Sequence, residues 1–121
     1  MNFKALPLAL SLCIAQPLFA HGGAEPKHGG IVATAHDLAF ELVVAGDDAH
    51  LYLQDHGKAM PATGVSGKLT VLKGGASSEH VLSASAARLE ARGAKLAKGA
   101  KVVAVLTLPG QQAVTVRFSL K

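Results

Sequence analysis

Residues 38–55 decide the fold, and they read LAFELVVAGDDAHLYLQD. Large apolar side chains occupy every second position of residues 38–44, and leucines at 51 and 53 resume this alternation after a Gly-Asp-Asp break. A period of two is the pattern of a strand with one buried face. A two-residue turn at 46–47, or alternatively at 47–48, pairs the strands with their leucines on the same face. The stretch therefore predicts an antiparallel hairpin.

The rest of the chain carries further strand signals between glycine-bearing breaks. Two alternating runs, 102–108 and 114–120, predict a second hairpin around Pro109-Gly110. Residues 67–74 and 79–82 supply two shorter strands. Breaks at this spacing are typical of all-β domains rather than of βαβ units. We expect one all-β domain over 31–121, a small antiparallel β-sandwich of Ig-like or Greek-key type with about seven short strands.

One segment, Ser83 to Lys98, gives an ambiguous signal. Its Ala, Arg, Leu, Glu and Lys content favours a helix by propensity. Gly93 interrupts that helix, however, and Leu89 and Leu96 are its only large apolar residues. We favour a short strand near 88–91 followed by a loop, with a helix as the alternative.

The first twenty residues follow the order of a secretory signal peptide. Lys4 precedes an apolar run from Ala5 to Ile14, and Ala20 stands just before a polar, glycine-rich segment. The apolar run is shorter than the ~20 residues that a membrane span needs. We expect residues 1–20 to be cleaved after Ala20, with Ala24 as the second choice. The mature chain would then be periplasmic and would have no membrane span.

Composition narrows the classes of function. The chain has 121 residues, 12 Lys and Arg against 8 Asp and Glu, a formal charge of +4, six His and one Cys. Scattered positive charge with few aromatic residues argues against nucleic-acid binding. Cleavage removes Cys13, so disulfides and thiolate sites are excluded from the mature chain. Because the sequence has neither a Gly-x-Ser-x-Gly nor a His-Glu-x-x-His motif, we do not expect an enzyme.

The histidines are the main candidate metal ligands. Residues 21–30 read HGGAEPKHGG, a duplication of His-Gly-Gly in what we expect to be a flexible N-terminal arm. Neutral imidazole is a common ligand of Cu(II) and Zn(II), and glycine lets the backbone fold tightly around an ion. After cleavage at Ala20, the ring and the α-amine of His21 could chelate one Cu(II) together. His21 and His28 are therefore the leading candidates.

Three further residues are candidates to complete the metal shell. His36 precedes Asp37, whose simplest role is to cap a turn. His56 lies in an Asp-His-Gly-Lys segment that turn chemistry also explains. Glu41 shares the outer face of the first hairpin with His50, where a metal could bridge them or both side chains could be solvated. His36, Glu41 and His56 complete the candidate set.

Several segments together resemble one protein family. They are His28-Gly29-Gly30-Ile31-Val32, Asp37 with 40–43, Tyr52-Leu53 with 55–58, 99–110 and 113–118. Over nearly the whole expected mature chain, they are similar to the small periplasmic domain at the amino-terminal side of membrane-fusion adaptors of cobalt-zinc-cadmium type heavy-metal efflux pumps. The residues that match the family pattern are His28, Asp37, Glu41, Asp55 and His56. The chain departs from it in Ala59-Met60, which separates Lys58 from Pro61, and in His36.

The resemblance implies a compact β-sandwich with a role in metal resistance. We therefore expect a periplasmic protein that sequesters or delivers a divalent transition metal, Cu(II) or Zn(II), for efflux. The alternative is a non-catalytic interaction module that docks on the adaptor of a heavy-metal efflux pump without binding metal itself.

Overall fold

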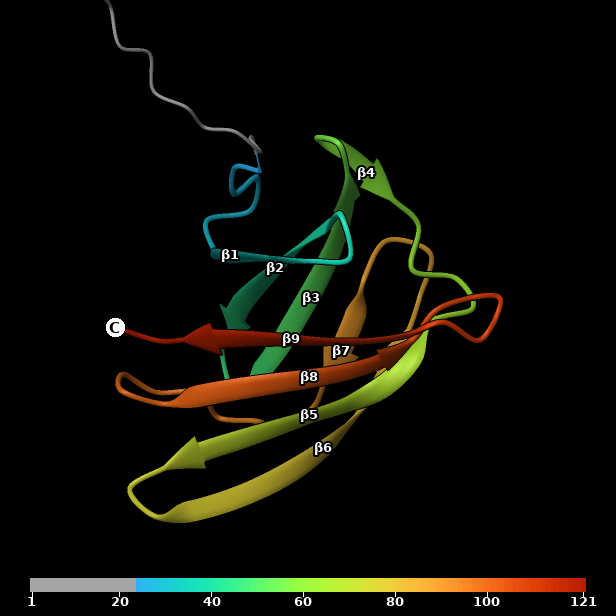
Figure 1. The fold of residues 1–121 in the computed structure, drawn as a ribbon. Helices are drawn as coiled ribbons and strands as arrows, with labels where there is room; N and C mark the ends of the chain where they lie inside the picture. Colours follow the sequence, from blue (N-terminus) through green and yellow to red (C-terminus); the bar gives the residue numbers. More distant parts are fainter. Residues whose placement is uncertain (1–23) are drawn as a thin grey trace, which may run out of the picture.

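The computed structural model describes residues 24–121, in which the regular elements are all β-strands (Figure 1). The strands are β1 (Ile31–Ala35), β2 (Leu38–Ala45), β3 (Asp48–Asp55), β4 (Lys58–Met60), β5 (Ser66–Lys73), β6 (Ala76–Ala84), β7 (Leu89–Ala91), β8 (Lys101–Thr107) and β9 (Ala113–Ser119). The expected signal segment 1–20 and His21 lie outside the described residues. Over residues 24–121 there is no helix with the length and apolarity of a membrane span.

One antiparallel sheet contains all of these strands and curls round on itself. Its order is β1-β2-β3-β7-β6-β5-β8-β9, and β4 pairs with the end of β3. Strand β6 links the two halves, because residues 76–82 pair with β5 and residues 83–84 pair with β7. The two ends of the order, β1 and β9, lie beside each other (Figure 1). The sheet is therefore barrel-like and nearly closed.

The expected all-β, antiparallel class is confirmed, but the seven-strand sandwich is wrong. Residues 24–121 form nine strands, of which all but β4 follow one continuous path rather than two separate sheets. Strand β4 has only three residues, too few to show a period in the sequence. It forms because the turn at His56-Gly57 returns the chain alongside β3.

The hairpin predicted from residues 38–55 is confirmed as β2 and β3. Its turn lies at 46–47, the first of the two alternatives. Leu42 pairs with Leu51, and both side chains are buried. Because side chains alternate between faces, this register turns Glu41 to the outer face of the sheet.

The later elements also follow the sequence pattern. Strands β8 and β9 form the second predicted hairpin, and the short strand expected near 88–91 is β7. The remainder of the ambiguous segment 83–98 contains no helix.

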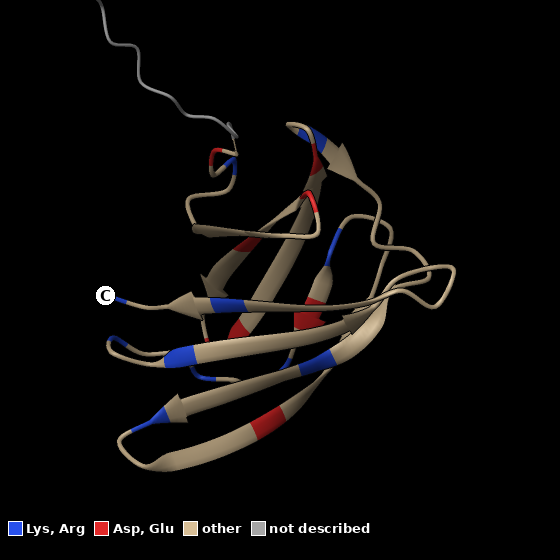
Figure 2. Cartoon of the chain, in the orientation of Figure 1, with Lys and Arg blue, Asp and Glu red and all other residues tan. Residues whose placement is uncertain are grey.

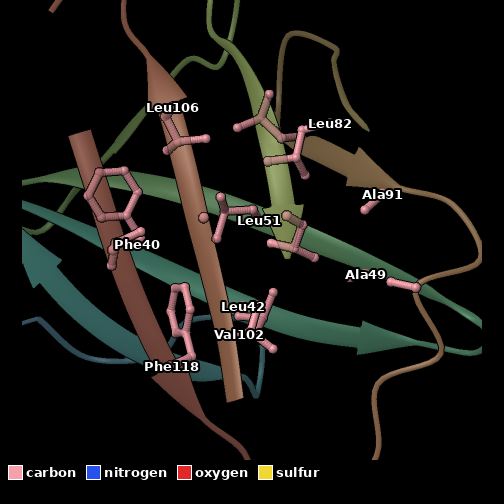
Figure 3. Packing of buried hydrophobic residues seen from close by; sticks show 14 of the residues in the cluster. Phe40, Leu42, Ala49, Leu51, Leu82, Ala91, Val102, Leu106 and Phe118 are labelled. Atoms are coloured by element: carbon pink, nitrogen blue, oxygen red, sulfur yellow. The ribbon is translucent and has the colours of Figure 1, made fainter. Parts of the chain in front are cut away.

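The buried apolar side chains form a single cluster inside the curled sheet (Figure 3). Phe40 and Leu51 come from one half of the sheet, and Leu106 and Phe118 come from the other. Because burial of a large apolar side chain contributes roughly 1.5–3 kcal/mol, this cluster holds the two halves together. It thereby fixes the outer face of β2 and β3.

Candidate functional site

Glu41 lies on the outer face of β2, yet its side chain is completely buried. The chain before β1 crosses this face and covers the carboxylate. Oε1 accepts a hydrogen bond from the backbone N–H of Lys27 at 2.9 Å. Oε2 accepts hydrogen bonds from the N–H groups of His28 and Gly30, both at 2.8 Å. A carboxylate that takes up three backbone donors pins the segment from Lys27 to Gly30 to the sheet.

Gly30 allows this close approach. A Cβ atom at position 30 would lie 2.3 Å from the carbonyl oxygen of Leu42. Only a residue without a side chain can pass the β2 backbone at that distance. The glycine therefore has a packing role in the His-Gly-Gly sequence.

The ring of His28 is held between a carboxylate and an aromatic face. Its Nδ1 lies 3.1 Å from Oε1 of Glu41. The imidazole stacks on Tyr52, with 3.6 Å between ring centroids and 7° between the planes. Tyr52 is the direct partner of Glu41 in the β2–β3 register, so one pair of strands supplies both contacts. The His28 side chain remains 42% exposed.

These contacts set the charge of Glu41. Burial by itself raises the pKa of this carboxyl group. The N–H groups of Lys27 and Gly30, the ring of His28 and its N–H group lower the pKa. The hydrogen bonds prevail, so the pKa of Glu41 lies below its ordinary value and the carboxylate is ionised at neutral pH.

The geometry selects one tautomer of a neutral His28 ring. Glu41 is an acceptor, so Nδ1 must carry the proton that faces it. The lone pair of the ring then lies on Nε2. Histidine that donates one N–H to a carboxylate and uses its other nitrogen as a ligand is a recurrent arrangement in metal proteins. The four contacts to Glu41 occupy its oxygens, so this carboxylate is suited to orient the ring rather than to ligate an ion.

Two more contacts hold the segment before β1. Lys27 Nζ donates to the carbonyl of Gly57 at 3.1 Å, and Gln54 Nε2 donates to the carbonyl of Glu25 at 3.2 Å. A cavity of about 410 Å³ lies beside these contacts. Its lining includes His28, Tyr52, Gln54 and Met60. Within residues 24–121, the buried Oε1 of Gln54 has no hydrogen-bond partner.

The other candidate residues lie in turns. His36 and Asp37 connect β1 to β2 with φ values of 54° and 65°, and His36 Nδ1 lies 3.3 Å from Nε2 of Gln112. His56 begins the turn after β3 with φ of 52° and pairs with Asp55 at 2.7 Å. The side chains of His36 and His56 therefore contact Gln112 and Asp55, respectively, rather than His28. His21 lies outside the described residues.

The structure brings together two of the five candidates, His28 and Glu41. From the sequence, we considered a metal that bridges Glu41 and His50 on the outer face. In the structure, Nε2 of His50 instead lies 3.9 Å from Oε2 of Glu90. Within residues 24–121, no group of three or more His, Cys, Asp or Glu side chains has metal-binding geometry.

Sequence reasoning missed Tyr52 and Lys27 as partners of the site. Strand parity could have identified Tyr52, because it occupies the outer face of the same hairpin as Glu41. The folding of residues 25–30 over that face has no periodic signal. Comparison of the chain with protein-family models, curated proteins and solved structures finds no match. The resemblance to efflux-adaptor domains rests on the motifs quoted above.

Proposed function

We propose that this chain is an exported, periplasmic protein that binds a divalent transition metal, Cu(II) or Zn(II), for efflux or resistance. The metal is its cargo, and no catalytic activity is part of the proposal. The single observation that carries it is the ring of His28, whose Nδ1 faces the buried carboxylate of Glu41. This pairing leaves Nε2 as the nitrogen that can bind an ion.

The described residues fit an open site better than a closed one. His28 supplies one ligand, and Glu41 orients its ring through Nδ1. Water completes the shell, together with the ring and α-amine of His21 if the signal segment is removed after Ala20. Structural zinc sites have four protein ligands, whereas a carrier must release its ion. A shell with few protein ligands therefore suits sequestration and delivery.

Calorimetric titration of the chain from His21 onward with Cu(II) and with Zn(II) tests this proposal. The informative variant is His28→Asn, because the asparagine amide can still donate to Glu41 from the position of Nδ1 but has no counterpart of Nε2. We expect the wild type to bind more tightly than ~100 μM and His28→Asn to bind at least tenfold more weakly. The matched control His80→Asn should bind as the wild type does. Wild-type binding weaker than ~100 μM for both metals would exclude the carrier role.

A second candidate function is docking on an efflux-pump adaptor without metal. It is favoured by two exposed apolar side chains on the outer face of the sheet. Val81 and Val105 flank Lys68 in the strand register and are 70% and 48% exposed. Adaptor binding by metal-free protein that is unchanged in His28→Asn and lost in Val81→Ser/Val105→Ser would support this alternative. It would also remove the need for a metal site.

A further inference from the structure

A second cavity, of about 340 Å³, is lined by residues between Val71 and Ala100. One wall is the β5–β6 hairpin, and the other is the loop formed by residues 93–100. We infer that this cavity binds a small oxyanion, such as a phosphate group. The inference does not depend on metal binding, because none of the residues at the His28 site lines this cavity.

The lining provides the donors that a small oxyanion requires. Lys73 and Lys95 line it from the two walls, and Ser77, Ser78 and His80 supply further polar groups. Neither Asp nor Glu is among its lining residues. Lysine is a common phosphate binder as a point charge, and hydroxyl groups can donate to phosphate oxygens.

Each of the two lysines is held by a hydrogen bond to another part of the chain. Lys73 Nζ donates to the carbonyl of Lys98 at 3.1 Å, which leaves its other two N–H donors for a ligand. Lys95 has a φ of 49°, a left-handed conformation that is uncommon outside glycine. Its backbone N–H donates to the carbonyl of Asp47 at 2.9 Å, and this bond holds the loop against the β2–β3 turn.

The electrostatic surroundings are also mainly positive. Arg92, Lys98 and Lys101 are exposed close to the lining residues in sequence. Figure 2 shows positively charged segments at the carboxyl end of β5 and at the start of β8. Two carboxylates belong to the surroundings. Asp48 Oδ1 accepts the N–H of Gly93 at 2.9 Å, and Glu79, which stands between Ser78 and His80 on β6, pairs with Lys68 at 3.4 Å. Their charges oppose an anion, but the basic residues outnumber them.

Two polar side chains that line the cavity contact each other. Ser78 Oγ lies 2.9 Å from Nε2 of His80, and both belong to the cavity-facing side of β6. This side is set by the register, in which His80 is opposite the buried Leu69. The contact fixes the hydroxyl and the ring relative to each other without using a lysine. Lys95 and the two remaining N–H donors of Lys73 are therefore left for the anion.

Titration of the metal-free protein with inorganic phosphate, followed by amide chemical shifts at constant ionic strength, tests the inference. We expect saturable shifts in residues 73–80 and 93–98, and at least tenfold weaker binding in Lys73→Gln/Lys95→Gln. The control Lys58→Gln/Lys68→Gln has the same loss of charge at residues that do not line the cavity, and it should keep most of the affinity. Lys73→Arg, which preserves the charge, should also bind phosphate.

Three outcomes would overturn the inference. The first is the absence of saturable shifts up to tens of millimolar phosphate, on the order of the weakest affinities that count as binding. The second is equal weakening in both double variants, which would show a general charge effect. The third is an identical response to sodium chloride. Circular dichroism of each variant excludes loss of the fold as the cause.

Discussion

Nδ1 of His28 lies 3.1 Å from Oε1 of Glu41, and the Glu41 side chain has no exposed surface. The two residues are 13 positions apart and belong to different segments, since His28 precedes β1 and Glu41 lies within β2. The same carboxylate also accepts hydrogen bonds from the backbone N–H groups of Lys27, His28 and Gly30. Glu41 therefore holds in place both the backbone of residues 27–30 and the imidazole ring of His28.

Replacement of Glu41 by Gln should destabilise the fold. The Gln amide presents N–H donors to backbone N–H groups that now bond to a carboxylate, and buried donors without partners are costly. We expect a loss of about 2–4 kcal/mol in the free energy of unfolding, measured by urea denaturation at pH 7. The control Glu79→Gln changes an exposed residue that pairs with Lys68 at 3.4 Å, and its loss should stay within about 0.5 kcal/mol. Equal losses in the two variants would show that Glu41 has no special role.

The contribution of Glu41 to stability should depend on pH. Its pKa in the folded protein lies below the ordinary value, so the folded state favours the ionised form. This stabilisation is fully present above the unfolded-state pKa, about 4.3, and it is lost as pH falls through the lower folded-state pKa. The difference in stability between wild type and Glu41→Gln should therefore shrink in acid. Urea denaturation from pH 7 to pH 2.5 measures this difference, and a constant value would contradict the hydrogen-bonded carboxylate.

A methyl group at position 30 should separate the covering segment from β2. The Cβ atom of Gly30→Ala would lie 2.3 Å from the Leu42 carbonyl oxygen, so the backbone must shift away from the sheet. We expect a loss of about 2 kcal/mol in unfolding free energy, in the usual range for overpacking. Gly29→Ala is the control, because its φ of +76° is unfavourable for Ala but its Cβ would meet no atom. If Gly29→Ala loses more stability than Gly30→Ala, the close approach is not the important constraint.

The His36-Asp37 turn should be improved by substitution. Both residues have positive φ values, 54° and 65°, and Asn-Gly is the favoured pair for such a hairpin turn. We expect His36→Asn/Asp37→Gly to stabilise the protein by about 1 kcal/mol and to leave Cu(II) affinity unchanged. Thermal denaturation and metal titration of the same sample measure the two effects. A loss of metal affinity would return His36 to the set of ligands.

The sequence was sufficient to predict the hairpins because their signal is local. Alternation in residues 38–55 specified which side chains of β2 and β3 face inward, but it left two turns open, and the structure selects the turn at 46–47 and with it the register. The nearly closed sheet was beyond prediction because β6 changes partners from β5 to β7 within one strand. Alternation records which face is buried, but it does not record which strand lies at each edge.

The candidate site could be predicted only in part for a similar reason. His28 and Glu41 were both named from their residue types, but parity alone suggested His50 as the neighbour of Glu41. The actual neighbour comes from a glycine-rich segment without periodicity, which is held by side chain to backbone hydrogen bonds. His36 and His56 were named because histidine is a common metal ligand. Both residues have a left-handed backbone conformation in a turn, and this turn role explains their positions in the chain.

We propose that Nε2 of His28 binds the metal while Nδ1 stays bonded to Glu41. Titration of ¹⁵N-labelled protein with Zn(II), followed by the imidazole nitrogen resonances, tests it most directly. We expect one equivalent of Zn(II) to shift the Nε2 resonance of His28 most and to leave its Nδ1 protonated. Unchanged His28 resonances, together with shifts at His56 or His80 or at none of the histidines, would contradict it.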